Sequence, residues 1–350
     1  MKVCLNMIVK DEEKVIERCL SSVKDWIDYW VIVDTGSSDQ TKSKIFNSLK
    51  NIPGELHDRP WVNFAWNRNE ALSLAKTKAD YLLFIDADDQ LVVSQGFKKP
   101  IFVKDVYIAI QQDESRSIDT RCLLLAKSSL NWRWEGAAHE SLLCPDVKSA
   151  ELLQGVINLY GHDGNRSQDP EKLQKVIQLL LDEQKKDPSN TKPVFYLAST
   201  YFSAKNYAAS KKMYEKRASM GGFEEEIFWS LYSIAKNEEF LGKDPNTVLN
   251  SLIRAHERRP ARMEPIYDII SLYRKMDRVD LAYELAKKSY DKKVPPSDVI
   301  FVHSWIYEWG ILWQYALCAI ALNKKDEAAF AIEKLRAVSN LPDSLKSSIG

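Results

Sequence analysis

The sequence predicts two domains of different class: an α/β domain with a mostly parallel sheet over residues 1–169, and an all-α domain of helical repeats over residues 170–350. Three observations support this. The chain has 350 residues, which is long for a single domain. Its first half alternates short apolar runs with amphipathic segments, as α/β sheets do. Beyond about residue 170 the strand signals end, and one helical pattern follows another.

The chain begins with a predicted strand and helix. Residues 3–9 are nearly all apolar, which is typical of a parallel strand buried on both faces. The next segment places Val15, Cys19 and Val23 at helical spacing, and Asp11 is the predicted N-cap. These two segments form the first strand–helix unit of the predicted sheet.

Two later strands end on carboxylates. The apolar residues 30–33 lead into Asp34, and the strand predicted over residues 81–85 leads into Asp86. A helix predicted over about residues 63–78 precedes the second of these strands. Ligands of open α/β sheets bind outside the carboxyl ends of the strands. The acidic residues therefore lie where a site is expected.

The second half shows irregular internal repeats. One segment fits the tetratricopeptide pattern of a helical hairpin, with Tyr196, Leu197, Ala198, Tyr201, Ser210 and Tyr214. Small residues expected at the tight helix contact recur as Ser210, Val248, Ala282 and Ala328, separated by 38, 34 and 46 positions. An α-solenoid of four hairpins is the simplest interpretation, since each hairpin buries its apolar face only against its neighbours.

Composition narrows the class of function. Lys plus Arg (49) balance Asp plus Glu (49), so nucleic acid and anionic membranes are not expected as main partners. The five cysteines are scattered, with no CxxC pair, which favours a reducing compartment. No apolar run reaches the ~20 residues needed to cross a bilayer. We therefore expect a soluble cytoplasmic protein without a membrane span.

The acidic triplet of Asp86, Ala87 and Asp88 suggests divalent-metal chemistry. Two carboxylates one residue apart at a strand end can both reach a hard cation and the phosphates it bridges. Mg²⁺ or Mn²⁺ would neutralise the charge that grows on a diphosphate leaving group. The alternative is a solvated acidic turn, because such triplets are common by chance.

Four ordered segments resemble the family 2 glycosyltransferases, which have the Rossmann-like GT-A fold. They are residues 6–12 (NMIVKDE), 33–41 (VDTGSSDQT), 66–72 (WNRNEAL) and 84–89 (FIDADD). The resemblance covers about the first half of the chain. It is greatest to a subgroup with C-terminal tetratricopeptide repeats, which includes peptide-modifying enzymes such as the sublancin glycosyltransferase.

The resemblance implies roles for particular residues. Those expected to contact the nucleotide-sugar are Val9, Glu12, Asp34, Arg68, Asp86 and Ala87. Among these, Asp34 would hydrogen-bond the base, usually uracil, and Arg68 would approach the ribose and diphosphate. Asp86 and Asp88 would bind the metal. A carboxylate can read an imide N–H and a guanidinium suits phosphate, so the chemistry agrees.

Local structural roles are the alternatives for several of these residues. Glu12 could favour the dipole of the following helix, and Arg68 could be a surface charge on an amphipathic helix. For Ser38 and Asp39 we prefer the N-cap interpretation.

Residues 131–140 (NWRWEGAAHE) combine two tryptophans, a glycine and a His-Glu pair. Alternating aromatic residues would line one face of an extended segment, and such rings commonly pack against sugars. By resemblance this region supplies the catalytic base, for which Glu140 is the candidate. His139 is the alternative base, because its unperturbed pKa lies near neutrality. Many relatives have Glu-Asp here, so the choice between the two stays open. A third interpretation makes His139 a structural hydrogen-bonding residue.

Histidines elsewhere differ in context. His162 follows a glycine near the end of the α/β half, and by resemblance it is the candidate third metal ligand. His57, His256 and His303 have no comparable context, so we expect structural or surface roles for them.

The main functional hypothesis is an inverting, metal-dependent glycosyltransferase that moves a sugar from a nucleotide-sugar, UDP-linked by resemblance, to a protein or peptide held by the helical repeats. One alternative has a glycan or lipid-linked saccharide as acceptor, with the repeats forming a homodimer. A second is a non-catalytic scaffold whose repeats bind partners. The retention of Asp86, Asp88 and Glu140 argues against the scaffold.

Overall fold

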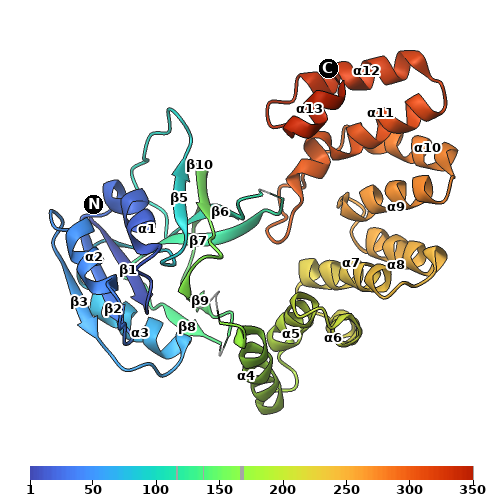
Figure 1. Cartoon of the computed structure of the whole chain (residues 1–350). Coiled ribbons are helices and arrows are strands. Elements are labelled where there is room, and N and C mark those ends of the chain that lie inside the picture. Colours follow the sequence, from blue (N-terminus) through green and yellow to red (C-terminus); the bar gives the residue numbers. More distant parts are fainter. Residues whose placement is uncertain (116, 137, 166–168, 350) are drawn as a thin grey trace. The chain divides into compact units, whose positions relative to one another are not determined.

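The computed structural model describes residues 1–115, 117–136, 138–165 and 169–349 (Figure 1). The chain divides into two compact units, Met1–Lys186 and Asp187–Gly350. The division falls one helix beyond residue 169, and the predicted domain boundary there stays a prediction. No helix in the described part of the chain is long and apolar enough to span a bilayer.

An eight-stranded sheet forms the centre of the first unit, in the order β3-β2-β1-β4-β7-β6-β10-β5. A separate two-stranded ribbon contains β8 and β9. The strands are β1 (Val3–Val9), β2 (Tyr29–Asp34), β3 (Gly54–Asp58), β4 (Tyr81–Phe84), β5 (Gln90–Val93), β6 (Val106–Gln112), β7 (Thr120–Lys127), β8 (Arg133–Glu135), β9 (Ser141–Leu143) and β10 (Ala150–Leu159).

The sheet is mixed, and its first half is entirely parallel. β1 pairs in parallel with both β2 and β4, and β2 pairs in parallel with β3. β7 then lies antiparallel to β4 and β6, whereas β10 runs parallel to β6 and antiparallel to β5. The predicted α/β class with a mostly parallel sheet is confirmed. Because β1, β2 and β4 are parallel, their carboxyl ends share one edge.

Helices cover both faces of the parallel half. The helices of this unit are α1 (Ile16–Val23), the 3₁₀ turn η1 (Lys24–Trp26), α2 (Thr41–Ser48), α3 (Phe64–Ala75) and α4 (Lys172–Lys186). Leu5 and Met7 pack in one core with α1 and α2, whereas Cys4 packs in the other core with α3. This alternation follows from the two-residue period of a strand. The Asn6 side chain donates to the carbonyl of Ala71 and ties β1 to α3.

One predicted helix start is wrong. Asp11 does not cap the first helix, which begins at Ile16 with Val15 at the N-cap position. The backbone of Asp11 is left-handed, with φ 54°, and its carboxylate accepts hydrogen bonds from Ser38 instead. Asp39 accepts from the amide of Thr41, the first residue of α2, so its side chain does serve the start of that helix.

The second unit contains helices that follow one another in antiparallel pairs (Figure 1). They are α5 (Thr191–Ser203), α6 (Tyr207–Ser219), α7 (Glu224–Phe240), α8 (Pro245–Arg258), α9 (Glu264–Lys275), α10 (Val279–Ser289), the π-helical turn η3 (Ile306–Gly310), α11 (Ile311–Ala321), α12 (Lys325–Arg336) and α13 (Asp343–Ile349). Ser210, Val248, Ala282 and Ala328 are buried in α6, α8, α10 and α12. The predicted all-α repeat domain of four hairpins is confirmed.

The same turn closes every hairpin. One residue in each turn is left-handed, with φ between 56° and 66°: Lys205, Gly242, Asp277 and Asn323. The amide of the following residue donates to the carbonyl five positions earlier at 2.8–3.0 Å in all four turns. This is the Schellman motif, which satisfies carbonyls at a helix end. The four hairpins therefore share a backbone signature that their sequences hide.

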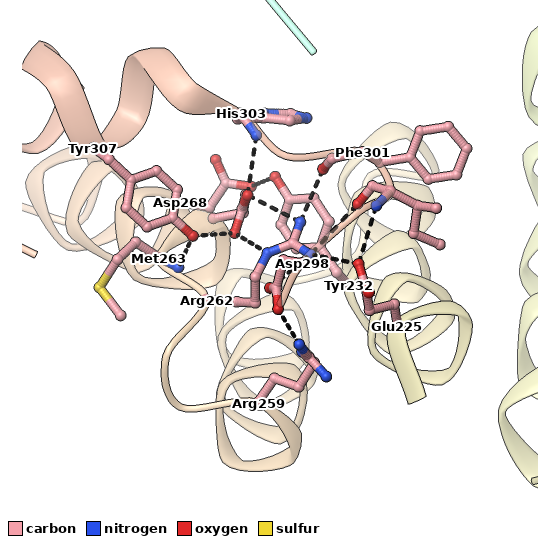
Figure 2. Close-up of polar contacts among 12 residues, drawn as sticks. Glu225, Tyr232, Arg259, Arg262, Met263, Asp268, Asp298, Phe301, His303 and Tyr307 are labelled. Carbon is pink, nitrogen blue, oxygen red and sulfur yellow. Dashed lines mark hydrogen bonds and ion pairs between the residues drawn. The ribbon is translucent and has the colours of Figure 1, made fainter. Parts of the chain in front are cut away.

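An insertion explains the longest repeat spacing. Residues 290–305 lie between α10 and η3, and a buried ion network fastens them to α7 and α9 (Figure 2). The Arg262 guanidinium pairs with Glu264 at 2.9 Å and with Asp298 at 3.3 Å, and all three side chains are fully buried. The Glu225 carboxylate accepts hydrogen bonds from the amides of Val299 and Ile300. Arg262 donates to the carbonyls of Ile300 and Phe301.

Candidate active site at the strand ends

The carboxyl ends of β1, β2 and β4 bring together the acidic residues that the sequence places after strands. Asp34 is the last residue of β2, and Asp86 follows β4 after one further residue. Val9 ends β1 and is paired with Asp34 in the ladder between β1 and β2. The predicted edge of the sheet is thus the edge at which these residues meet.

The Asp34 side chain is fully buried, and only one of its two carboxylate oxygens is hydrogen-bonded. Its Oδ1 accepts hydrogen bonds from the amides of Gly36 at 2.8 Å and Ser37 at 2.7 Å. Its Oδ2 has no hydrogen-bond partner in the described part of the chain. An open hollow of about 270 Å³ is lined by Asp34, Gly36, Asp58, Arg59 and Pro60. A buried acceptor without a donor is costly, so an N–H group of a ligand in this hollow would relieve it.

Val9 and Glu12 have different surroundings. The Val9 side chain is buried in the core, and its carbonyl accepts from the amide and hydroxyl of Thr35. Glu12 accepts from the amide of Asn165 at 3.2 Å. Burial, with the nearby charge of Asp88, raises the pKa of Glu12 to about 7. Of the two, only Glu12 presents a side chain to the acidic edge.

The acidic triplet divides into an exposed, a buried and a half-buried residue. The Asp86 side chain is 56% exposed, whereas the Ala87 side chain packs in the sheet core. Burial and the charge of Asp86 raise the pKa of Asp88. Asp89, the next residue, is buried, and burial raises its pKa to about 8, with the charge of Asp86 adding to the effect. Burial and the neighbouring negative charge therefore both disfavour the charged forms of Asp88 and Asp89.

These carboxylates fit a divalent cation that shares its ligands with a substrate. In the described residues, no three His, Cys, Asp or Glu side chains lie close enough to hold a metal ion by themselves. Mg²⁺ in phosphoryl sites is usually bound by one or two carboxylates together with substrate phosphates and water. Asp86 and Asp88 match that donor set. Burial, with the charge of Asp86, raises the pKa of Asp88, and a bound cation would favour its charged form.

Arg68 links the acidic turn to the candidate base. Its Nη2 donates to Asp86 Oδ1 and its Nε to Glu140 Oε1, both at 2.6 Å. The guanidinium also lies over the ring of Trp134, 4.8 Å from the centroid. Its side chain is only 12% exposed, so the surface-charge alternative is wrong. Asp86 and Glu140, 54 residues apart in sequence, are thereby joined in one hydrogen-bonded group.

The ribbon of β8 and β9 carries Glu140 to this place. Asn69 of α3 fixes the ribbon, because its side chain both accepts from the amide and donates to the carbonyl of Trp134. The Trp134 ring packs edge-on against Phe84, and Trp132 packs against the same core. The two tryptophans do share a face, as predicted. Both side chains are only half-buried, and Trp132 also lines an open hollow of about 800 Å³ together with Arg133 and Leu143, so the predicted sugar contact stays a prediction.

The two candidate bases differ in exposure. The Glu140 side chain is 10% exposed, whereas His139 is exposed and has a left-handed backbone with φ 53°. The structure thus places Glu140 within the hydrogen-bonded group and leaves the His139 side chain exposed. The choice of base stays a prediction.

The loop that carries His162 lies against the acidic turn. A Cβ on Gly161 would come within 2.2 Å of the Asp88 carbonyl oxygen, and one on Gly164 within 2.8 Å of Asp88 Oδ2. The His162 ring packs edge-on against Tyr160 at 4.9 Å. The loop is where a third ligand was expected, and ligation by His162 itself stays a prediction.

The sequence interpretation did not identify several residues of this region. Asp58 and Arg59 line the hollow beside Asp34, and Asp89 binds Asn158 and the amide of Gly161. Asp89 had a visible signal, because it follows the triplet directly. Asp58 ends β3 and Arg59 follows it; β3 is an edge strand without a buried residue, and its apolar pattern is therefore weak.

Comparison with known proteins agrees with the geometry. Residues 4–93 match the model of Glycosyl transferase family 2. An uncharacterized glycosyltransferase of Rickettsia typhi is 25% identical over 162 residues, which are 46% of this chain and 52% of that protein. The SPbeta prophage-derived glycosyltransferase SunS of Bacillus subtilis is 33% identical over 84 residues, or 24% of this chain and 19% of that protein.

Two further comparisons cover smaller or more divergent similarities. A TPR repeat-containing protein of Synechococcus elongatus is 37% identical over 92 residues, which are 26% of this chain and 22% of that protein. The crystal structure of MamA covers 50% of this chain and 94% of its own, with 16% identity and a TM-score of 0.37. The chain spans about half or less of the length of these curated relatives. The match to the Glycosyl transferase family 2 model lies within the first unit.

Proposed function

We propose that this protein is an inverting, divalent-metal-dependent glycosyltransferase that moves a sugar from a UDP-sugar to a protein or peptide acceptor held by the helical repeats. The observation that carries the proposal is the group formed by Arg68 with Asp86 and Glu140. It joins a candidate diphosphate contact, a candidate cation ligand and a candidate base at the edge where α/β sheets bind ligands.

The hollow beside Asp34 suits the base of the donor. Uracil has one imide N–H, and the unpartnered Asp34 Oδ2 is an acceptor buried at this hollow. Asp34 is also held rigidly by the amides of Gly36 and Ser37, so its free oxygen is aimed before the ligand arrives. A preorganised acceptor loses little entropy on binding.

Asp86 and Asp88 would hold Mn²⁺ or Mg²⁺ with the donor diphosphate. The cation, when bound, supplies Lewis-acid stabilisation of the negative charge that develops on the leaving diphosphate. Ala87 contributes only its backbone, because its side chain is in the core.

Glu140 is the base that we favour for the transfer. The acceptor nucleophile forms a bond to the anomeric carbon while the bond from that carbon to the diphosphate oxygen breaks, and the acceptor proton passes to the base. Arg68 holds Glu140 before the donor binds. Diphosphate oxygens compete for the same guanidinium N–H groups. Donor binding would therefore release the Glu140 carboxylate for proton transfer, and His139 remains the second candidate.

The helical unit is the proposed acceptor-binding part. A solenoid of four hairpins offers an extended surface suited to a peptide. Half-buried aromatic side chains follow one another on this unit: Trp229 contacts Phe301 at 4.8 Å, and Trp305 contacts Trp309 and Tyr267 at 4.9 Å. Aromatic rings give a peptide large contact area at little entropic cost.

A second candidate acceptor is a lipid-linked saccharide, with the repeats forming a homodimer. One observation favours it. Three large apolar side chains close together in sequence are exposed: Trp61 (43%), Val62 (50%) and Trp66 (45%). They follow Pro60, which lines the hollow beside Asp34. Exposed apolar clusters of this kind often mark interaction surfaces.

Incubation with Mn²⁺ and a panel of nucleotide-sugars tests the activity. Slow release of nucleoside diphosphate is expected from a UDP-sugar and not without the metal. A protein that neither hydrolyses nor binds any nucleotide-sugar would contradict the proposal. Substituting Trp61 and Trp66 by Ser then separates the acceptors, because only transfer to a lipid-linked saccharide should fall in that variant.

A further inference from the structure

The loop at residues 160–165, called the glycine loop from here on, is fastened to the acidic turn from three directions. Its Asp163 is bound by Arg18 of α1, the amide of its Gly161 donates to Asp89, and the amide of its Asn165 donates to Glu12. Arg18 and Asp163, which make one of these attachments, have no role in the proposed reaction so far. Three attachments to one short loop indicate that its position matters.

Arg18 makes the strongest attachment. Its Nη1 and Nη2 donate to the two Asp163 carboxylate oxygens at 2.7 and 2.8 Å. Its Nη2 also donates to the main-chain carbonyl of Asp88 at 2.7 Å. Two parallel bonds to one carboxylate fix direction as well as distance. One side chain thus holds both the glycine loop and the backbone of the acidic triplet.

The glycine loop fits closely against Asp88. Gly161 and Gly164 lie so near the carbonyl and carboxylate of Asp88 that neither position has room for a Cβ. Asp89, the neighbour of Asp88, accepts from Asn158 Nδ2 at 2.7 Å and from the Gly161 amide at 3.1 Å. The direction of the Asp88 side chain therefore depends on where the loop is held.

Electrostatics alone gives no reason for an arginine here. A cation site gains from negative charge, and an added guanidinium would oppose the metal by Coulomb repulsion. Asp163 offsets that charge, since the bidentate pair is neutral overall, and hydrogen bonding from Arg18 lowers the pKa of Asp163. The pair of Arg18 and Asp163 therefore fixes the position of the acidic turn without adding net charge to it.

We propose that Arg18 is a positioning residue of the cation site: by binding Asp163 and the Asp88 carbonyl together, it fixes the glycine loop so that the Asp88 carboxylate faces the donor diphosphate. The proposal rests on the proposed function. It assigns to α1 a part in metal binding that no motif of the sequence indicates.

The substitution Arg18→Lys separates geometry from charge, since lysine keeps the charge and loses the planar fork. We expect Mn²⁺ affinity in the presence of UDP, measured by electron paramagnetic resonance, to fall on the order of tenfold, as for other residues that orient metal ligands. UDP affinity without metal, measured by calorimetry, should not change. A general loss of structure would instead lower both affinities.

The substitution Arg18→Gln gives a second test, because a positioning role and a purely electrostatic effect of Arg18 predict opposite changes in Mn²⁺ affinity. Positioning predicts weaker Mn²⁺ binding, whereas removal of a repelling charge predicts tighter binding. The matched control is Glu17→Gln, which removes the exposed 2.7 Å ion pair to Lys44 from the same helix. It should leave Mn²⁺ and UDP affinity at the wild-type values.

Hydrogen exchange of the glycine loop checks the structural step without any ligand. Faster exchange is expected in Arg18→Lys and not in Glu17→Gln. Wild-type Mn²⁺ affinity in Arg18→Lys, or tighter Mn²⁺ binding in Arg18→Gln, would overturn the positioning role of Arg18 and leave the proposed function standing. If the wild-type protein bound neither UDP nor Mn²⁺, the proposed function would fail, and the positioning role with it.

Discussion

Both units bury charged side chains, and they do so in opposite ways. In the helical unit, the fully buried Arg262 forms ion pairs with Glu264 and Asp298, whose side chains are also fully buried (Figure 2). At the strand ends of the first unit, the carboxylates are only partly paired and are called unmatched here. Asp34 Oδ2 has no hydrogen-bond partner among the described residues, Lys42 lies 3.9 Å from Asp34 Oδ1, and Asp86 is 56% exposed although Arg68 binds one of its oxygens. Matched buried charge holds a fold together. Unmatched charge at a sheet edge leaves capacity for a ligand, at a cost in stability.

The largest effect is expected from breaking the matched network. Arg262→Met should lower the free energy of unfolding by about 3–5 kcal/mol, because it leaves the buried Glu264 carboxylate without its cationic partner and leaves Asp298 with Arg259 alone. Urea unfolding measures this. Arg258→Met is the matched control, because its ion pair with Glu224 at 2.7 Å is exposed, and its loss should cost about 0–1 kcal/mol. Equal effects of the two substitutions would refute the structural importance of the network.

Breaking the unmatched site should change activity and leave the fold intact. Asp88→Asn should reduce metal-dependent turnover on the order of 100-fold, since a Lewis acid supplies several kcal/mol of transition-state stabilisation. Its free energy of unfolding should be unchanged or higher, because repulsion with Asp86 is removed. Donor hydrolysis and urea unfolding together check this. The exposed Asp25→Asn serves as control, and wild-type turnover in Asp88→Asn would exclude the metal role.

Arg68 combines features of both units. It is largely buried, like Arg262, but it binds the candidate metal ligand Asp86 and the candidate base Glu140. Arg68→Lys cannot reach Asp86 and Glu140 together. The loss of one hydrogen bond to a charged group is worth about 1.5–3 kcal/mol, so turnover should fall tenfold or more. Steady-state kinetics with Arg133→Lys as control, an arginine 73% exposed on the same ribbon, decides whether the fork geometry matters.

The smallest effect is a difference in pH response between the units. Folding raises the pKa of Glu12 to about 7 and of Asp89 to about 8, so the folded first unit binds more protons than the unfolded chain. Its stability should fall as pH rises from about 5 to about 8. Burial lowers the pKa of His256 and His303, so the helical unit should instead gain stability as pH rises through about 6.5.

Hydrogen exchange followed unit by unit, and corrected for the intrinsic exchange rate, can detect these opposite slopes. Asp89→Asn should flatten the slope of the first unit only. A first unit that gains stability across this range would contradict the assignment of uncompensated acidic charge to the strand ends.

The sequence predicted those parts of the site that local patterns determine. Apolar runs place the ends of β2 and β4, and parallel pairing then brings Asp34 and Asp86 to one edge. Contacts between distant segments had no local signal: Arg18 and Asp163 are 145 positions apart, and Arg68 and Glu140 are 72 apart. These pairs depend on how α1 and the ribbon of β8 and β9 pack on the sheet.

Local conformation caused the remaining errors. Asp11 has the residue type of an N-cap, but its left-handed backbone turns the carboxylate to Ser38. The alternation of Trp132 and Trp134 correctly indicated a shared face, but the pattern gave no sign that both rings also pack on the core around Phe84. In the helical unit, the tetratricopeptide pattern around Tyr196 and the recurring small residues indicated about four hairpins, while the shared left-handed turns at Lys205 and Asn323 were hidden by differing residue types.

The central claim is that the unmatched charge at the strand ends binds a nucleoside diphosphate together with a divalent cation. Calorimetric titration of the wild-type protein and Asp34→Asn with UDP, with and without Mn²⁺, tests it most directly. We predict UDP binding that Mn²⁺ strengthens in the wild-type protein, and much weaker binding in Asp34→Asn under both conditions. UDP binding that is independent of Mn²⁺, or equally tight in Asp34→Asn, would contradict the claim.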